Sequence, residues 1–199
     1  SDGKRCLVVR TTGTVKYGDD DTHVESISSG GHISITETVA GVERRYEAGS
    51  GSGGLDETFY LDGKRVDAAS GRPWLRTVIP QIVRQNAELA PARAARIRSK
   101  EGIAGVLAEV TAISGDYAKR AYLDALIAQE RITSDSLRTI ADAGARELSS
   151  DYDRAEFLAR VAHMSHDPAT SATIAAAAAK MSSDYYKTKL LSSGLSSGS

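Results

Sequence analysis

The chain has 199 residues, with 25 basic and 26 acidic side chains, and 41% of its residues are apolar. This length and charge balance are typical of one or two small globular domains, and they exclude a disordered chain or one that coats nucleic acid by charge alone. The single cysteine, Cys6, excludes an intrachain disulfide and any multi-cysteine zinc or iron–sulfur site. The longest apolar run covers residues 174–179, whereas a membrane-spanning helix needs about 20 residues.

The first 70 residues predict an antiparallel β-sheet domain. Apolar and polar side chains alternate over residues 33–39 and 42–48, which is the pattern of half-buried strands. Ala40-Gly41 joins these two runs, and Asp62-Gly63 joins two later ones. Asp-Gly readily takes the positive φ angles that a two-residue hairpin turn demands. We therefore predict a meander of about five or six strands, with the Gly/Ser tract at 49–54 as its loosest loop.

A helical period of about 3.6 residues begins near Pro73. Pro73 suits a first helical turn, and Pro80 predicts a kink or an early stop. The residues expected on one face of this helix are Trp74, Val78, Ile82 and Val83.

A five-residue motif occurs three times in the remaining sequence. Its copies are Ile113-Ser114-Gly115-Asp116-Tyr117, Leu148-Ser149-Ser150-Asp151-Tyr152 and Met181-Ser182-Ser183-Asp184-Tyr185. Each copy is followed by a helical pattern and preceded by another, at residues 102–111, 134–146 and 168–180. Two helices per unit of about 34 residues are typical of an α-solenoid, because one hairpin cannot bury its apolar stripe alone.

The motif has a structural interpretation. A serine hydroxyl would cap the second helix, and the aspartate of the first turn would meet the positive end of the helix dipole. The tyrosine ring is expected to lie buried between helices, and the leucines seven residues after each aspartate (Leu123, Leu158 and Leu191) are expected to continue the core. Asp167-Pro168 predicts a cap and a first-turn proline for the third hairpin. A repeated ligand-binding role for the motif is the alternative.

The basic side chains concentrate between the strand-like first 70 residues and the helical repeats. Residues 1–70 carry 8 basic and 12 acidic groups, residues 71–100 carry 7 and 1, and residues 101–199 carry 10 and 13. The resulting cationic surface could dock an acidic protein, lipid headgroups or a phosphate backbone, and a solvated face that pairs with the acidic sheet is the alternative. We expect a protein partner and no nucleic acid, because base-stacking aromatic residues are absent from this segment apart from Trp74. The candidate contact residues are Arg76, Arg84, Arg93, Arg96 and Lys100.

Motifs of common enzyme classes are missing. The sequence contains no His-Glu-x-x-His zinc motif and no Gly-x-x-x-x-Gly-Lys phosphate loop. Residues 49–54 fit Gly-x-Gly-x-x-Gly, but they open no helix whose N-terminus could hold a pyrophosphate. We therefore predict no catalytic residue, no cofactor and no bound metal.

Two clusters of acidic or histidine side chains are candidate metal sites. His163, His166 and Asp167 are spaced so that they could surround one metal ion, and they carry the alternative function of a small metal-dependent hydrolase. The simpler interpretation is an inter-helix turn in which Asp167 caps the next helix. The acidic run at 19–21 lacks the alternate spacing and closing glutamate of a calcium loop, so a solvated turn is predicted.

The chain resembles a family of bacterial extracytoplasmic regions in which a small β-meander precedes Ser-Ser-Asp-Tyr helical repeats. Some of these regions stand beside the membrane metallopeptidase domain of beta-lactam-sensor-like regulatory proteins. The resemblance covers nearly all of residues 6–195 and is carried by the three repeats together with residues 13–16, 28–31 and 60–64. It implies a periplasmic sensing or docking module, and no catalytic residue, because the peptidase motif belongs to the membrane part. The start at Ser1, without an initiator methionine, agrees with an excised segment of a membrane-tethered parent.

The sequence thus predicts an α+β chain, with an N-terminal antiparallel β-meander followed by an α-solenoid-like array of helical hairpins. Its expected parts are a sheet domain at 1–70, a basic helical junction at 71–100, repeats at 101–195 and a flexible tail at 196–199. The expected function is a non-catalytic protein-binding or sensing module, part of a larger bacterial membrane-associated regulator. A metal-dependent hydrolase and a purely structural spacer are the alternatives.

Overall fold

The computed structural model describes residues 5–128, 132–165 and 167–195, so the predicted tail at 196–199 lies outside the described residues. The chain is α+β, with strands in its first part and helices in the rest, as predicted. It divides into two compact units, Ser1–Val83 and Arg84–Ser199. This division runs through the segment expected to be a basic junction.

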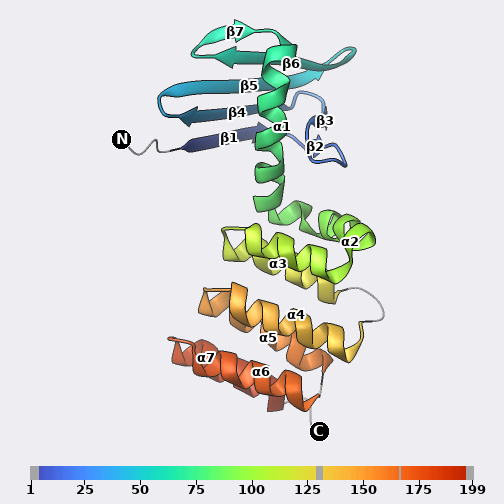
Figure 1. Cartoon of the computed structure of the whole chain (residues 1–199), viewed down its shortest axis with the longest axis vertical. Helices are drawn as coiled ribbons and strands as arrows, with labels where there is room; N and C mark the ends of the chain where they lie inside the picture. The colour runs from blue at the N-terminus through green and yellow to red at the C-terminus, as the bar shows by residue number, and fades with distance from the viewer. Residues whose placement is uncertain (1–4, 129–131, 166, 196–199) are drawn as a thin grey trace. The chain divides into compact units, whose positions relative to one another are not determined.

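The first unit contains a five-stranded antiparallel sheet and a separate two-stranded hairpin (Figure 1). The strands are β1 (Cys6–Thr12), β2 (Val15–Tyr17), β3 (Val24–Ile27), β4 (His32–Val39), β5 (Val42–Gly51), β6 (Gly54–Leu61) and β7 (Lys64–Val66). The order in the large sheet is β1-β4-β5-β6-β7, and β2 pairs with β3. The meander is therefore interrupted once, because the β2–β3 hairpin leaves the sheet and β4 returns to pair with β1.

The two predicted hairpin turns form as expected. Both central residues have positive φ in each turn, 50° and 84° at Ala40-Gly41 and 47° and 76° at Asp62-Gly63. Such angles match the twist of the flanking strands. The prediction of a loose loop at residues 49–54 is wrong, because β5 and β6 continue through most of this tract and pair as far as Gly51 and Gly54.

Helix α1 (Ala68–Gln85) lies across one face of the large sheet (Figure 1). A side chain at Gly71 would place its Cβ 2.2 Å from Cδ1 of Phe59, so the glycine permits this close approach to β6. Of the kink or early stop expected at Pro80, the early stop does not occur, because the helix continues to Gln85, and the helix also begins before Pro73. Burial of one helical face offsets the lost hydrogen bonds. The buried residues of the helix are Gly71, Leu75, Val78, Ile79 and Val83, whereas Trp74 and Ile82 are half-buried.

The second unit consists of helices that pack as hairpins, as predicted. They are η1 (Ala87–Leu89), α2 (Ala90–Ala112), α3 (Asp116–Ile127), α4 (Ser134–Glu147), α5 (Asp151–Met164), α6 (Pro168–Ala179) and α7 (Asp184–Leu195). Helix α2 is broken at Gly102, where φ is 70° and ψ is −167°. The second helices of the hairpins pack in the order α3, α5, α7, and the first helices in the order α2, α4, α6.

One continuous apolar core runs through these hairpins. Leu123 and Leu158 are fully buried, as the repeat predicts. The prediction is wrong for Leu191, which is 44% exposed, whereas the preceding residue, Leu190, is fully buried. Leu191 belongs to α7, the last helix that the structure describes.

Among the residues that the structure describes, no helix combines the length and apolar character needed to cross a membrane.

Candidate functional site

The repeated motif places a helix cap and an inter-repeat contact side by side. Ser150 is the N-cap of α5, and its hydroxyl accepts a hydrogen bond of 3.3 Å from the amide of Asp153. Ser183 accepts the corresponding bond, at 3.5 Å, from the amide of Tyr186. The first copy has Gly115 at this position and makes no side-chain cap.

The first two motif aspartates, Asp116 and Asp151, bind the next repeat rather than only their own helix. Oδ2 of Asp116 accepts hydrogen bonds from the amides of Ser149 and Ser150, at 3.0 and 2.5 Å. Oδ2 of Asp151 accepts the amides of Ser182 and Ser183, both at 2.8 Å. Each of these aspartates therefore satisfies two backbone donors of the following hairpin. The sequence predicted their place in the first helical turn but not this contact.

The motif tyrosines are exposed, which corrects the expectation that their rings lie buried between helices. Tyr117 is 66% exposed, Tyr152 is 46% exposed and Tyr185 is 69% exposed. They occupy the second position of α3, α5 and α7, where the side chain points away from the apolar stripe. The core positions expected for tyrosine are taken by other residues of the same helices, such as Tyr122 and Phe157.

The exposed tyrosines are linked into one surface by ring contacts. The guanidinium carbon of Arg120 lies 5.7 Å from the ring centroid of Tyr117 and 5.1 Å from that of Tyr152. The ring of Tyr186 lies 5.8 Å from Tyr152 and 5.0 Å from Tyr185, both in edge-to-face geometry. We call the set Tyr117, Arg120, Tyr152, Tyr185 and Tyr186 the tyrosine row. It crosses three repeats on helices α3, α5 and α7.

Ion pairs between repeats hold the tyrosine row in place. Arg120 forms an ion pair of 3.3 Å with Asp153, and Arg160 forms one of 2.9 Å with Asp124. Burial by itself would lower the pKa of Arg120, but its contacts with Tyr152 and Asp153 outweigh this effect and raise it. Arg120 is therefore a fixed cation between two tyrosine rings.

Two of the five basic residues predicted as a contact surface, Arg84 and Arg93, are engaged within the second unit. Arg84 and Arg93 meet around Glu109, each with a hydrogen bond of 2.5 Å to its Oε1 atom. Burial tends to raise the pKa of Glu109, but the hydrogen bonds from the two arginines outweigh burial and hold it below its usual value. Arg93 is buried, Arg96 is half-buried and Lys100 is exposed. Arg84 and Arg93 thus act within the fold as partners of a carboxylate.

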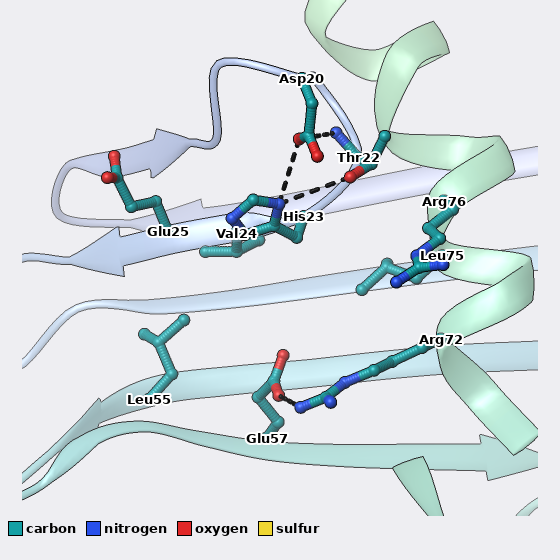
Figure 2. A pocket seen from close by; sticks show the side chains of 10 residues that line it. All are labelled: Asp20, Thr22, His23, Val24, Glu25, Leu55, Glu57, Arg72, Leu75 and Arg76. Atoms are coloured by element: carbon teal, nitrogen blue, oxygen red, sulfur yellow. Dashed lines mark hydrogen bonds and ion pairs between the residues drawn. The ribbon is translucent and has the colours of Figure 1, made fainter. Parts of the chain in front are cut away.

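Arg76, the fifth predicted residue, lines a pocket of the first unit (Figure 2). The pocket has a volume of about 520 Å³ and lies among the loop before β3, strand β6 and helix α1. In its lining, Arg72 pairs with Glu57 at 3.0 Å, and Nδ1 of His23 lies 3.1 Å from Oδ1 of Asp20. The remaining lining residues are Thr22, Val24, Glu25, Leu55 and Leu75.

The pocket is lined by charges that largely satisfy each other. Glu57 accepts a hydrogen bond of 2.9 Å from the hydroxyl of the buried Tyr46, in addition to its pair with Arg72. Hydrogen bonds from Thr22, together with the nearby His23, lower the pKa of Asp20. Asp20 is thus bound to a neighbouring amide and to an imidazole, in agreement with the turn predicted for the acidic run. The pocket was not predicted, because its residues come from three separate segments of the sequence.

The candidate metal cluster of His163, His166 and Asp167 is only partly described. His166 lies outside the described residues, and His163 is exposed near the end of α5. Asp167 is the N-cap of α6, and its Oδ2 atom accepts the amide of Thr170 at 3.0 Å. Within the described ranges, no three His, Cys, Asp or Glu side chains gather as metal ligands do.

The family models, the curated proteins and the solved structures compared with this chain include no match to it.

Proposed function

We propose that this chain is a non-catalytic protein-binding module and that the tyrosine row is its contact surface. The observation that carries the proposal is the exposure of the same tyrosine in three successive repeats, between 46% and 69%. Single exposed aromatic residues are ordinary on protein surfaces, whereas a contiguous set of large rings is typical of an interaction site. Contacts through Arg120 and Tyr186 make these three rings contiguous.

The chemistry of the tyrosine row suits a protein partner. Tyrosine and arginine are enriched among the residues that contribute most to protein interfaces, because they bury a large area and also form hydrogen bonds. Nucleic acid is disfavoured, since Asp151 and Asp184 directly precede two of the tyrosines and would repel phosphate groups. The proposed partner surface is neutral or basic, because lysine and arginine side chains can stack on tyrosine rings.

The regular spacing of equivalent side chains along the repeats supports this proposal. Stacked hairpins present equivalent side chains at regular intervals, so a single partner can contact several repeats at once. Arg120 bridges Tyr117 and Tyr152, and it is held by Asp153, so this part of the surface is ordered before binding. A preorganised surface loses less entropy when it binds.

A capture experiment tests the proposal. The immobilised chain is compared with the variant Tyr117→Ser, Tyr152→Ser, Tyr185→Ser on extracts of the source organism, and retained proteins are quantified by mass spectrometry. We expect retention of the partner to fall at least about tenfold in the triple variant, which corresponds to a loss of about 1.4 kcal/mol. The matched control is Val9→Ser, Leu61→Ser, which removes two exposed apolar side chains of the first unit. Equal retention by the triple variant and the wild type contradicts the proposal.

The periplasmic location and the membrane-tethered parent are implied by the family resemblance alone. They stay predictions, and the proposed binding function does not depend on them. The acidic partner expected from the charge distribution depended on the basic junction. Because Arg84 and Arg93 are engaged by Glu109, we propose the tyrosine row in place of that surface.

A further inference from the structure

The contacts inside the repeat stack follow one rule. Where a hairpin is followed by another, its motif aspartate accepts two consecutive serine amides of that following hairpin. Asp116 does so toward Ser149 and Ser150, and Asp151 does so toward Ser182 and Ser183. In the same hairpins, the leucine seven residues after the aspartate is fully buried.

The last hairpin breaks this rule in both respects. The side chain of Asp184 is 97% exposed, and its described contact is an ion pair of 3.4 Å with Lys187 on its own helix. Leu191 is exposed, although its equivalents Leu123 and Leu158 are fully buried. The last hairpin that the structure describes therefore presents the acceptor and the apolar side chain that the inner repeats use to bind the next hairpin.

We propose that Asp184 and Leu191 form a docking surface for one further helical hairpin of the same repeat type, carried by a partner polypeptide. The occupant gives Asp184 two consecutive backbone amides that precede a capped helix, and it covers Leu191 with an apolar face. This inference does not rest on the tyrosine row, because Asp184 and Leu191 lie outside that set.

The occupant follows from continuity with the two interfaces already present in the chain. Two consecutive amides pointing at one oxygen are supplied by the backbone that leads into a helix cap, as Ser149-Ser150 and Ser182-Ser183 show. A β-strand edge does not supply them, since its successive amides point in opposite directions. A lysine side chain could satisfy the charge of Asp184, but it would not bury Leu191.

At the first copy of the motif, a residue from outside the motif accepts the corresponding serine amide. The amide of Ser114, which corresponds to Ser149 in the next copy, donates to Oε1 of Gln85 at 3.2 Å. Gln85 thus supplies to the first copy an acceptor of the kind that Asp116 and Asp151 supply to later copies. No equivalent contact reaches Asp184 from the described residues.

The test extends the chain by a known hairpin. Residues 165–195 are duplicated directly after Leu195, so that the docking surface meets a hairpin of the right type at high local concentration. We expect the midpoint of thermal unfolding to rise by a shift on the order of 5 °C. The two serine amides of the added cap should exchange hydrogen at least about tenfold more slowly than in the extended Asp184→Ala variant.

Asp135→Ala is the matched control for Asp184→Ala. Asp135 also lies in the first turn of its helix, is largely exposed and pairs with an arginine three residues later, at 3.1 Å. In the extended chain, Asp184→Ala should remove at least half of the gain in midpoint, whereas Asp135→Ala should leave it. In the original chain the two substitutions should have equal, small effects.

Three results would overturn the proposal. The first is an added hairpin whose two serine amides exchange hydrogen as fast as in the extended Asp184→Ala variant. The second is a gain in midpoint that survives Asp184→Ala. The third is self-association of the original chain in solution that Asp184→Ala abolishes, since this result would assign the surface to a second copy. Loss of partner capture by the tyrosine variants alone would bear on the proposed function and leave this inference unchanged.

Discussion

Replacement of Asp151 by alanine tests the contact that joins the second hairpin to the third. The carboxylate is half-buried and accepts the amides of Ser182 and Ser183, both at 2.8 Å. Alanine removes both acceptor bonds at once. Because alanine also favours helix, the expected loss of stability cannot be attributed to a poorer helix former.

The size of the effect follows from the two bonds. A hydrogen bond to a charged group contributes about 1.5–3 kcal/mol, so two such bonds set an upper bound of about 3–6 kcal/mol. Ser182 is exposed and Ser183 is half-buried, so water can replace part of this interaction. We therefore expect the free energy of unfolding to fall by about 2–3 kcal/mol. Asp184→Ala loses an exposed ion pair, which contributes less than about 1 kcal/mol.

Urea unfolding followed by circular dichroism measures this difference, with Asp184→Ala as the control for the shared effect of a first-turn carboxylate. Hydrogen exchange at the amides of Ser182 and Ser183 provides a local measurement, and both should exchange at least about tenfold faster in Asp151→Ala. If the two variants differ by less than about 0.5 kcal/mol, the aspartate does not join the repeats, and the motif is only a helix cap.

Three further substitutions test the packing, the charge cluster and a turn. Gly144→Ala places a Cβ 2.2 Å from Cε1 of Phe157, so we expect the free energy of unfolding, measured with urea, to fall by about 1–3 kcal/mol. The additional substitution Phe157→Leu should restore part of this stability, because it removes the ring atom that the new methyl group meets. The pKa of Glu109 lies below its usual value of 4.5 because its hydrogen bonds to two arginines outweigh burial. The ionised carboxylate therefore stabilises the folded state fully at pH values above 4.5, and this stabilisation is lost as the pH falls through the lowered pKa of the folded state. Glu109→Gln should therefore lower the urea midpoint at neutral pH and reduce its acid dependence, and an unchanged acid dependence would speak against this role. Gly63→Ala, at a φ of 76° with open space around it, should cost about 1–2 kcal/mol by backbone strain alone, whereas Gly53→Ala, which has neither a positive φ nor a close neighbour, should be nearly neutral.

Several parts of the fold could be predicted because they depend on neighbours in sequence. The Asp62-Gly63 turn follows from the φ angles of two residues. The caps at Ser150 and Asp167 follow from a side chain that accepts an amide three residues later. The α+β order and the hairpin repeat follow from periodicity, since one face of each helix or strand must be buried.

The features that the sequence did not predict correctly depend on contacts between distant segments. Burial of one face carries α1 past Pro80, and strand pairing converts the tract at 49–54 from a loop into two strand ends. The pairing of Arg84 with Glu109 joins residues 25 positions apart, and neither residue shows this partner in its local sequence. The sequence identified basic side chains there, but the structure decides which of them are neutralised within the fold.

The sequence by itself determined the spacing of the repeats, their caps and their turns, because these features are set by local backbone conformation and by hydrogen bonds over three or four residues. Only the tertiary structure decided the direction of the motif side chains: the aspartate toward the amides of the next hairpin, and the tyrosine toward solvent. The physical reason is that a repeat pattern states which residues recur, whereas burial depends on which helix packs against each face, and that is a property of the assembled stack.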